Sequence, residues 1–230
     1  MALTLYELAG VGDNRFSPFC WRTRLALAHK GLEAETVPVT FGQKEKLTFS
    51  GQDRVPVLVD GDTVVADSWQ IACYLEDTYA DRPSLFGGDI GRGEALFLNA
   101  WSDTVVAGGL FPLLVNDVFA CTEEVDKPYF RKSRETRLGK SLEEVEAERD
   151  SRLPGFRKSL EPLRMVLARQ SFIGGDQSAY ADYIIFGLFQ WARLSSPYKL
   201  LVDDDPIYAW RERMLDLFDG LASGAKGFPL

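Results

Sequence analysis

The pattern of apolar residues changes its period near Tyr79, and this change restricts the possible folds more than any other feature of the sequence. Before it, short strand-like runs alternate with helical stretches; after it, no strand pattern is persuasive and helical stretches follow one another. A chain of 230 residues can form one large unit or two small ones. The sequence therefore predicts an α/β domain over residues 1–80, a linker over 81–91 and an all-α domain over 92–230.

The α/β part is predicted to have the order β-α-β, a polar loop, and then β-β-α. Strands are expected over residues 3–8, 35–39, 55–59 and 63–66, the last two joined by the tight turn Asp60-Gly61. Ser17 and Pro18 open the first helix, because serine is a good N-cap and proline suits the first helical position. Asp67 and Ser68 open the second helix in the same way.

The second part is predicted to consist of helices alone. A long helix is expected from Glu94 to about Phe119, bent near Gly108-Gly109 and Pro112. The region 123–152 has 8 basic and 9 acidic residues, which indicates a solvated face, and Ser141 with Glu144 fits a capping box within it. Further helices are expected over residues 180–194 and 206–218.

The composition excludes several classes of function. The net charge is −8, which argues against a general affinity for nucleic acid. His29 is the only histidine and would have to be the base of a Ser-His-Asp or Cys-His hydrolase, so the sequence argues against that class. His29 is expected on the surface or at a helix end. Cys20, Cys73 and Cys121 are odd in number and widely spaced, so neither disulfides nor a metal site is expected.

The chain has no recognisable signal peptide at Met1 and no uncharged run of the length that a bilayer requires. The longest nearly uncharged run, from Thr104 to Asn116, is shorter than the roughly 18 residues needed. We therefore expect no membrane span and a cytoplasmic location.

The run Ser17-Pro18-Phe19-Cys20 is the first motif that can carry chemistry. It lies where a thioredoxin-like fold places its C-x-x-C, but a hydroxyl replaces the first thiol, so dithiol chemistry is lost. A helix N-terminus and a hydroxyl donor suit a bound thiolate. Lowering a thiol pKa of about 8.5 by about two units requires about 2.7 kcal/mol, which one charge-assisted hydrogen bond and the helix dipole can supply. Alternatively, Ser17 only caps its helix.

Two further motifs lie at strand edges or helix starts. Val55-Pro56 suggests a cis peptide at a ligand-facing edge, where the backbone of Val55 can pair with an extended peptide. An ordinary edge-strand proline is the alternative. The helix N-terminus and the Ser68 hydroxyl can receive a carboxylate, and Asp67 can receive the matching ammonium group. Alternatively, both residues simply cap that helix.

Together, in this order, the three motifs resemble those of the glutathione transferases, and the resemblance covers essentially the whole chain. It implies the GST fold: a thioredoxin-like domain with a mixed four-stranded sheet, followed by an all-helical domain. It also implies that Ser17 stabilises the glutathione thiolate and that Val55, before cis-Pro56, pairs with the cysteinyl backbone. Asp67 and Ser68 are then expected to hold the γ-glutamyl end.

The run from Asn14 to Arg22 is similar to a smaller branch, the fungal ether-type (Fua) transferases and the bacterial LigE-like β-aryl-etherases. This resemblance implies Asn14 as a second donor to the sulfur. Lys44 or Lys46 is implied at the glycyl carboxylate, and the sequence leaves that choice open. The family resemblance adds Phe19 and Arg54 to the glutathione-binding residues and implies a homodimer.

One position departs from the family pattern: Ala179 stands where a serine or threonine usually caps a late core helix, while Asp182 is retained. The second substrate is expected between the two parts, in an aromatic and apolar site. Its candidate residues are Trp101, Phe111, Leu114, Val115 and Phe119, with the C-terminal run from Gly227 to Leu230. The alternative, which such helical spacing more often indicates, is plain core packing.

The sequence therefore favours a glutathione transferase whose thiolate attacks an electrophilic aromatic compound, with β-aryl ether cleavage as one such reaction. Glutathione is the expected cosubstrate and no metal is expected. A non-catalytic, ligandin-type protein that binds glutathione or hydrophobic ligands is the alternative. A redox enzyme is the weakest reading, because it needs a cysteine at position 17.

Overall fold

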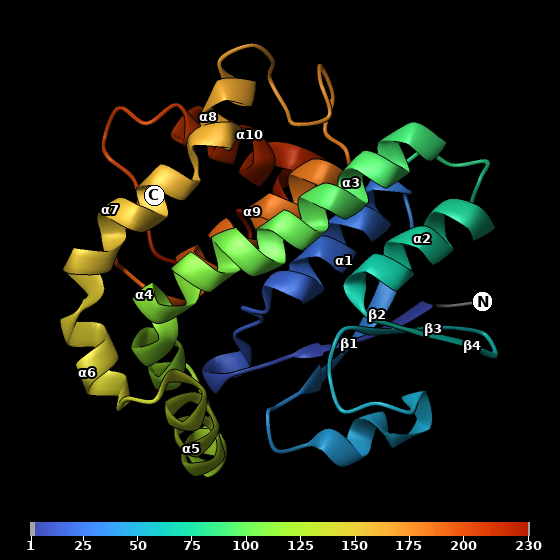
Figure 1. Ribbon diagram of the computed structural model, residues 1–230. Helices are drawn as coiled ribbons and strands as arrows, with labels where there is room; N and C mark the ends of the chain where they lie inside the picture. The colour runs from blue at the N-terminus through green and yellow to red at the C-terminus, as the bar shows by residue number, and fades with distance from the viewer. Residues whose placement is uncertain (1–2, 230) are drawn as a thin grey trace.

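A mixed four-stranded sheet forms the core of the N-terminal part in the computed structural model, which describes residues 3–229 (Figure 1). Its strands are β1 (Leu3–Leu8), β2 (Ala34–Val39), β3 (Val57–Asp60) and β4 (Thr63–Ala66). Their order is β2-β1-β3-β4, with β1 and β2 parallel and the other two pairs antiparallel. This is the thioredoxin-like sheet that the sequence predicts.

Two α-helices belong to the sheet part, α1 (Pro18–His29) and α2 (Ser68–Thr78). The helical part contains α3 (Asp89–Trp101), α4 (Ala107–Ala120), α5 (Lys127–Leu138), α6 (Leu142–Ala147), α7 (Arg149–Ser159), α8 (Glu161–Leu167), α9 (Tyr180–Ser195) and α10 (Ile207–Gly220). Short 3₁₀ helices are η1 (Val11–Asp13), η2 (Lys44–Ser50) and η4 (Glu124–Asp126). The predicted fold class, a thioredoxin-like domain followed by helices, is confirmed.

The loop before β3 differs in two ways from the sequence-based prediction. The Val55-Pro56 peptide bond is cis, as predicted, but the strand begins at Val57 and not at Val55. Proline has no N–H to donate to a ladder, so regular pairing starts after it. The segment predicted as a polar loop contains η2, which ends at Gly51 with a φ of 73°.

The long helix has a π-helical turn, η3 (Ser102–Val106), and α4 is helical through Gly108 and Gly109. The bend expected near Gly108-Gly109 and Pro112 stays a prediction. α3, η3 and α4 form one continuous helical segment that crosses the front of the molecule in Figure 1. Pro112 is accommodated inside α4. The irregular turn holds Ser102 and Asp103, which both accept hydrogen bonds from Arg22; π-helical turns often occur at functional sites.

This segment, Asp89–Ala120, has 32 residues and by length and composition alone could cross a membrane. That differs from the expectation drawn from the shorter run Thr104–Asn116. In the structure the segment packs against α6, α7 and α9 of the same chain, and the core helix of a globular protein can pass the same test of length and hydropathy.

Arg22 of α1 fastens the sheet part to the helical part. Its side chain is fully buried, and its guanidinium donates to the Ile184 carbonyl at 3.2 Å, Asn99 at 3.1 Å and Asp103 at 2.7 Å. On α9, Gly187 permits close approach, because a Cβ there would lie 2.5 Å from the carbonyl oxygen of Pro18. α1 and α9 therefore pack backbone against backbone near the start of α1.

Two local predictions in the helical part can be compared directly with the structure. Ser141 and Glu144 form the predicted capping box at the start of α6. At the start of α9, Ala179 supplies no side-chain cap, but the buried Asp182 accepts four hydrogen bonds, from the backbone N–H groups of Ile173, Gly174 and Ala179 and from the Trp210 indole. Compared with the usual capping box, α9 lacks only the hydroxyl of the N-cap residue.

Candidate functional site

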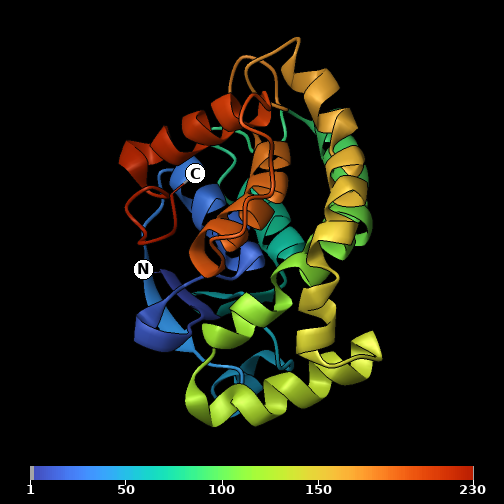
Figure 2. The same ribbon diagram turned by 90° about the vertical axis from the view of Figure 1, so that its left-hand side faces the viewer.

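A cavity of about 530 Å³ lies between the sheet part and the helical part. From the sheet side it is lined by Ser17, Phe19, Phe41, Lys44, Arg54 and Val55. From the helical side it is lined by residues of the long helix, α5 and α9. Figure 2 shows α5 running beneath the rest of the molecule, close to the blue η2 segment. The cavity therefore has walls from two parts of the chain that are distant in sequence.

Ser17 is the N-cap of α1 and faces this cavity. Its Oγ accepts a hydrogen bond from the backbone N–H of Cys20 at 3.4 Å, which is long for such a bond. The following residue, Pro18, has no N–H, and the first helical N–H groups point toward the cap. Ser17 thus combines the predicted capping role with a position in the cavity wall.

Cys20 lies one turn into α1 and does not line the cavity. It is 1% exposed. Burial, with the nearby Glu7 carboxylate, raises the pKa of its thiol to about 12. Burial likewise raises the pKa values of Cys73 and Cys121. Reactive cysteines have lowered pKa values, so the redox alternative finds no support here.

Lys44 and Lys46 have different positions. Lys44 lines the cavity; its Nζ donates to Asp53 at 2.7 Å and lies 5.1 Å from the Tyr129 ring centroid. The Asp53 carboxylate raises the pKa of Lys44. Lys46 instead donates to the carbonyl of Pro38 and is not among the lining residues. Arg54 lines the cavity beside Asp53, with its side chain 88% exposed.

Val55, Asp67 and Ser68 lie along one edge, although only Val55 lines the cavity. β3 and β4 pair Val57 with Ala66, and the N–H of Asp67 donates to the Pro56 carbonyl at 3.2 Å. Asp67 caps α2 through one oxygen, Oδ1, which accepts from the N–H groups of Trp69 and Gln70. Its exposed carboxylate keeps the second oxygen for another partner.

Asn14, the predicted second donor to the sulfur, does not line the cavity either. Its amide Nδ2 donates to the carbonyl of Leu194 at 2.8 Å, and the side chain also lies against the Cys121 thiol. Asn14 therefore joins the loop after β1 to the ends of α4 and α9. A role as second sulfur donor stays a prediction.

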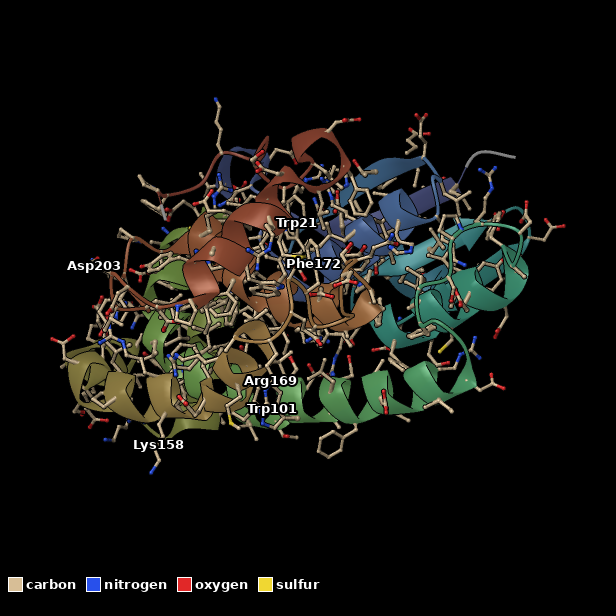
Figure 3. The ribbon with its side chains drawn as sticks, turned by 90° about the horizontal axis from the view of Figure 1, so that it is seen from above. Trp21, Trp101, Lys158, Arg169, Phe172 and Asp203 are labelled. Atoms are coloured by element: carbon tan, nitrogen blue, oxygen red, sulfur yellow. The ribbon has the colours of Figure 1, made fainter. Side chains whose placement is uncertain are left out.

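The predicted apolar residues are only partly correct. Phe111 lines the cavity and stacks on Trp191, with ring centroids 6.4 Å apart. Leu114 and Val115 are fully buried core residues and do not line it. Trp101, labelled near the middle of the long helix in Figure 3, and Phe119 are half-buried and also absent from the lining. For these four residues the structure favours the alternative of plain packing, because helical spacing alone does not separate core-facing from cavity-facing positions.

The C-terminal run is not part of the cavity lining either. The N–H of Phe228 donates to the Arg193 carbonyl at 2.8 Å, which holds the described part of this run against α9. Leu230 lies outside the described residues. Within residues 3–229, no group of three or more His, Cys, Asp or Glu side chains converges as metal ligands would.

Sequence reasoning missed the contribution of α5. Tyr129, Phe130, Arg134 and Arg137 all line the cavity. The charged region was interpreted as a solvated face, but the spacing of Phe130, Arg134 and Arg137 places the three on one face of a helix. That periodicity was the signal available in the sequence.

The structure thus joins a thioredoxin-like sheet to a helical part, with a serine at the start of α1 and a cavity between the two parts, and this defines its structural class. The comparisons with known proteins identify that class. Residues 16–78 match the glutathione S-transferase N-terminal domain, and residues 94–200 match the C-terminal domain. The chain belongs to the glutathione S-transferase family.

Similar proteins come from plants and fungi. Glutathione S-transferase U28 of Arabidopsis thaliana is 23% identical over 207 residues, 87% of this chain and 81% of that protein. GSTFuA2 of Phanerochaete chrysosporium is 27% identical, with a TM-score of 0.74 and coverage of 96% and 93% of the two chains. A Ceriporiopsis subvermispora transferase solved with glutathione is 22% identical, covers 95% and 97%, and has a TM-score of 0.83. The likeness to fungal Fua-type transferases agrees with the predicted resemblance.

Proposed function

We propose that this protein is a glutathione transferase in which Ser17 stabilises the thiolate of bound glutathione. The observation that carries the proposal is the position of Ser17 in the cavity wall, at the N-terminus of α1. A hydroxyl hydrogen bond and the helix dipole both favour the charged sulfur over the neutral thiol. The thiol comes from the cosubstrate, so the protein supplies position and electrostatics.

The rest of glutathione is proposed to extend from Ser17 along the cis-Pro56 edge. Val55 is expected to pair with the cysteinyl backbone, since it lines the cavity just before β3. Asp67 and Ser68, at the start of α2, are expected to hold the γ-glutamyl end. At the other end, Lys44 is favoured over Lys46 for the glycyl carboxylate, because only Lys44 lines the cavity. Phe19 and Arg54 border the same space.

The reaction is proposed to be a nucleophilic displacement on an aromatic electrophile. The glutathione sulfur forms a bond to carbon while the leaving group departs with the bonding electron pair; in β-aryl ether cleavage this group is a phenolate, which takes a proton from water. Phe111 and Trp191 supply an aromatic wall on the helical side. Closeness of the two reactants contributes to the rate.

The quaternary structure and the location of the protein are proposed from its likeness to the family. We propose a homodimer in the cytoplasm. The exposed apolar side chains of Ile90 and Phe97 on α3, 82% and 76% exposed, support an interface on this helix. Light scattering of the purified protein measures the oligomeric state, and a monomer contradicts that part of the proposal.

The first prediction concerns Ser17→Ala. Loss of a charge-assisted hydrogen bond is worth about 1.5–3 kcal/mol, so the pH midpoint of thiolate formation in bound glutathione is expected to rise by about 1–2 units. Ultraviolet absorbance of the thiolate measures that midpoint. Ser17→Thr keeps the hydroxyl and serves as the matched control.

An unchanged midpoint in Ser17→Ala removes Ser17 from this role. The same titration of Asn14→Ala tests the second donor, and an unaltered midpoint there excludes Asn14. If the unaltered protein binds glutathione but turns over no aromatic electrophile from a broad panel, the ligandin-type alternative replaces the transferase.

A further inference from the structure

One wall of the cavity is cationic, and both cations come from α5. The guanidinium of Arg134 lies over two rings, 4.4 Å from the centroid of Phe130 and 5.1 Å from that of Phe41. One turn further on, Arg137 lies 4.7 Å from the centroid of Phe111. All five side chains line the cavity. Guanidinium groups and aromatic rings are thus interleaved across the surface that the second substrate would meet.

The carboxylates that line the cavity already have other partners. Asp53 pairs with Lys44 at 2.7 Å. Asp103 pairs with the buried Arg22, also at 2.7 Å. In the part of the chain that the structure describes, no carboxylate forms an ion pair with Arg134 or Arg137. The helical wall therefore keeps two positive charges that the protein does not neutralise.

Arg131, on the same helix, shows the contrasting arrangement. It pairs with Glu135 and Glu143, each at 2.8 Å, and does not line the cavity. The chain as a whole is acidic, with a net charge of −8, so carboxylates are not in short supply. Two arginines without carboxylate partners on one cavity wall form a local exception to the charge of the molecule.

The environment of Arg134 makes an anionic partner favourable. The side chain is half-buried, and burial lowers the pKa of its guanidinium, as does the charge of Arg137. Ring stacking compensates for part of the lost hydration. Its polar contacts include the hydroxyl of Ser133, at 2.7 Å, and the nearby Tyr129 hydroxyl. A bound carboxylate would add a charge-assisted and bidentate interaction to this site.

We propose that the second substrate is an aromatic electrophile that carries a carboxylate, and that Arg134 and Arg137 bind this carboxylate. The proposal rests on the proposed function, because it assigns this side of the cavity to the electrophile. The ring of the substrate packs among Phe41, Phe111 and Trp191, while its carboxylate faces α5. Arg134 and Arg137 then determine specificity and take no part in forming the thiolate.

The experiment compares two electrophiles of almost equal shape, a chlorodinitrobenzoate and its uncharged carboxamide. We expect the unaltered protein to prefer the benzoate. In Arg134→Gln, kcat/KM for the benzoate is expected to fall about tenfold to hundredfold, as for loss of a hydrogen bond to a charged group. The value for the carboxamide should change by less than about threefold, and the KM for glutathione should stay the same.

Matched variants separate local binding from general effects. Lys132→Gln removes one positive charge from the exposed side of α5 and should leave both substrates unaffected. Arg134→Lys keeps the charge and should retain part of the preference. A parallel loss for benzoate and carboxamide overturns the proposal. A raised KM for glutathione also overturns it, because the arginines then hold the glycyl carboxylate.

A binding measurement keeps this proposal distinguishable from the proposed function. Binding of an unreactive nitrobenzoate is followed by quenching of tryptophan fluorescence, since Trp191 lines the cavity. If neither electrophile reacts but Arg134→Gln still weakens nitrobenzoate binding at least tenfold, the transferase reaction fails and the anion site stands. Equal affinity in both proteins removes the site.

Discussion

At the scale of single residues, His29, the only histidine in the sequence, has a structural position. It ends α1 and is half-buried. Its Nε2 lies 3.0 Å from the carbonyl oxygen of Ser84, so Nε2 carries the proton that is donated there. Its Nδ1 lies 2.7 Å from the hydroxyl of Tyr183 and can accept from it. His29 therefore joins α1, the segment after α2, and α9.

This network predicts a pH dependence of stability. Burial lowers the pKa of His29 below its ordinary value of 6.5. The unfolded chain takes up the proton near pH 6.5 and the folded protein only at lower pH, so unfolding binds a proton in between. The free energy of unfolding should therefore fall as the pH is lowered below 6.5, and level off below the folded pKa.

The measurement is the melting temperature at about pH 7.5 and about pH 5.5, on either side of the ordinary histidine pKa. His29→Gln does not titrate and keeps an amide in place of the ring. The loss between the two pH values should be larger in the unaltered protein than in the variant. Equal losses would assign the pH dependence to the carboxylates alone.

At the scale of elements, the close packing of α1 and α9 sets the position of the Ser17 end of α1. A Cβ at Gly187 would lie 2.5 Å from the Pro18 carbonyl oxygen and 3.3 Å from Cγ of Arg22. Backbone cannot yield as a flexible side chain can, so the helices would have to separate. Because Pro18 follows Ser17 directly, such a shift would reach the cavity.

We expect Gly187→Ala to lower the free energy of unfolding by about 1–3 kcal/mol, as for overpacking in a core. It should also lower kcat/KM, measured with a small aromatic electrophile. Gly155→Ala on α7 is the matched control, since a Cβ there meets no atom within 4 Å and the residue does not line the cavity. If Gly187→Ala were as stable and as active as the control, the contact at Gly187 would not determine the distance between α1 and α9.

The elements also show what the sequence could and could not predict. Local chemistry was sufficient to predict the elements that depend on neighbouring residues. These are the strands, the Asp60-Gly61 turn and the helix caps at Ser17, Asp67 and Ser141. The π-helical turn was not predicted, because it depends on contacts between Ser102, Asp103 and the distant Arg22. The same reason applies to α5: only the folded chain shows which side of a charged helix meets the cavity.

At the scale of the whole molecule, the cavity exists only while the two parts are docked, and Arg22 is the main polar link between them. It is fully buried, whereas its partner Asp103 is 35% exposed on the cavity side. Removing one partner of a buried ion pair costs about 3–5 kcal/mol when the other stays buried. The partial exposure of Asp103 places the expected cost near the lower end of that range.

Arg22→Met is therefore expected to lower the free energy of unfolding by about 3 kcal/mol, measured by urea denaturation. Glutathione binding should weaken as well, because the docked arrangement is less populated and the apparent affinity falls with that population. Arg82→Met, at an exposed arginine whose only ion pair is the 3.9 Å contact with Asp81 among the described residues, is the control. Stability and affinity equal to those of the control would contradict the role given to Arg22.

The arrangement of α5 has a consequence for how such a protein can change over time. Lys44, Val55 and Ser17 all come from the first 55 residues, whereas Arg134 and Arg137 lie less than one turn apart on a single helix. In the proposed arrangement, cosubstrate binding and preference for the acceptor depend on separate stretches of the chain. A duplicated copy could exchange an acid acceptor for a neutral one through two codons of α5 and keep its thiol chemistry intact.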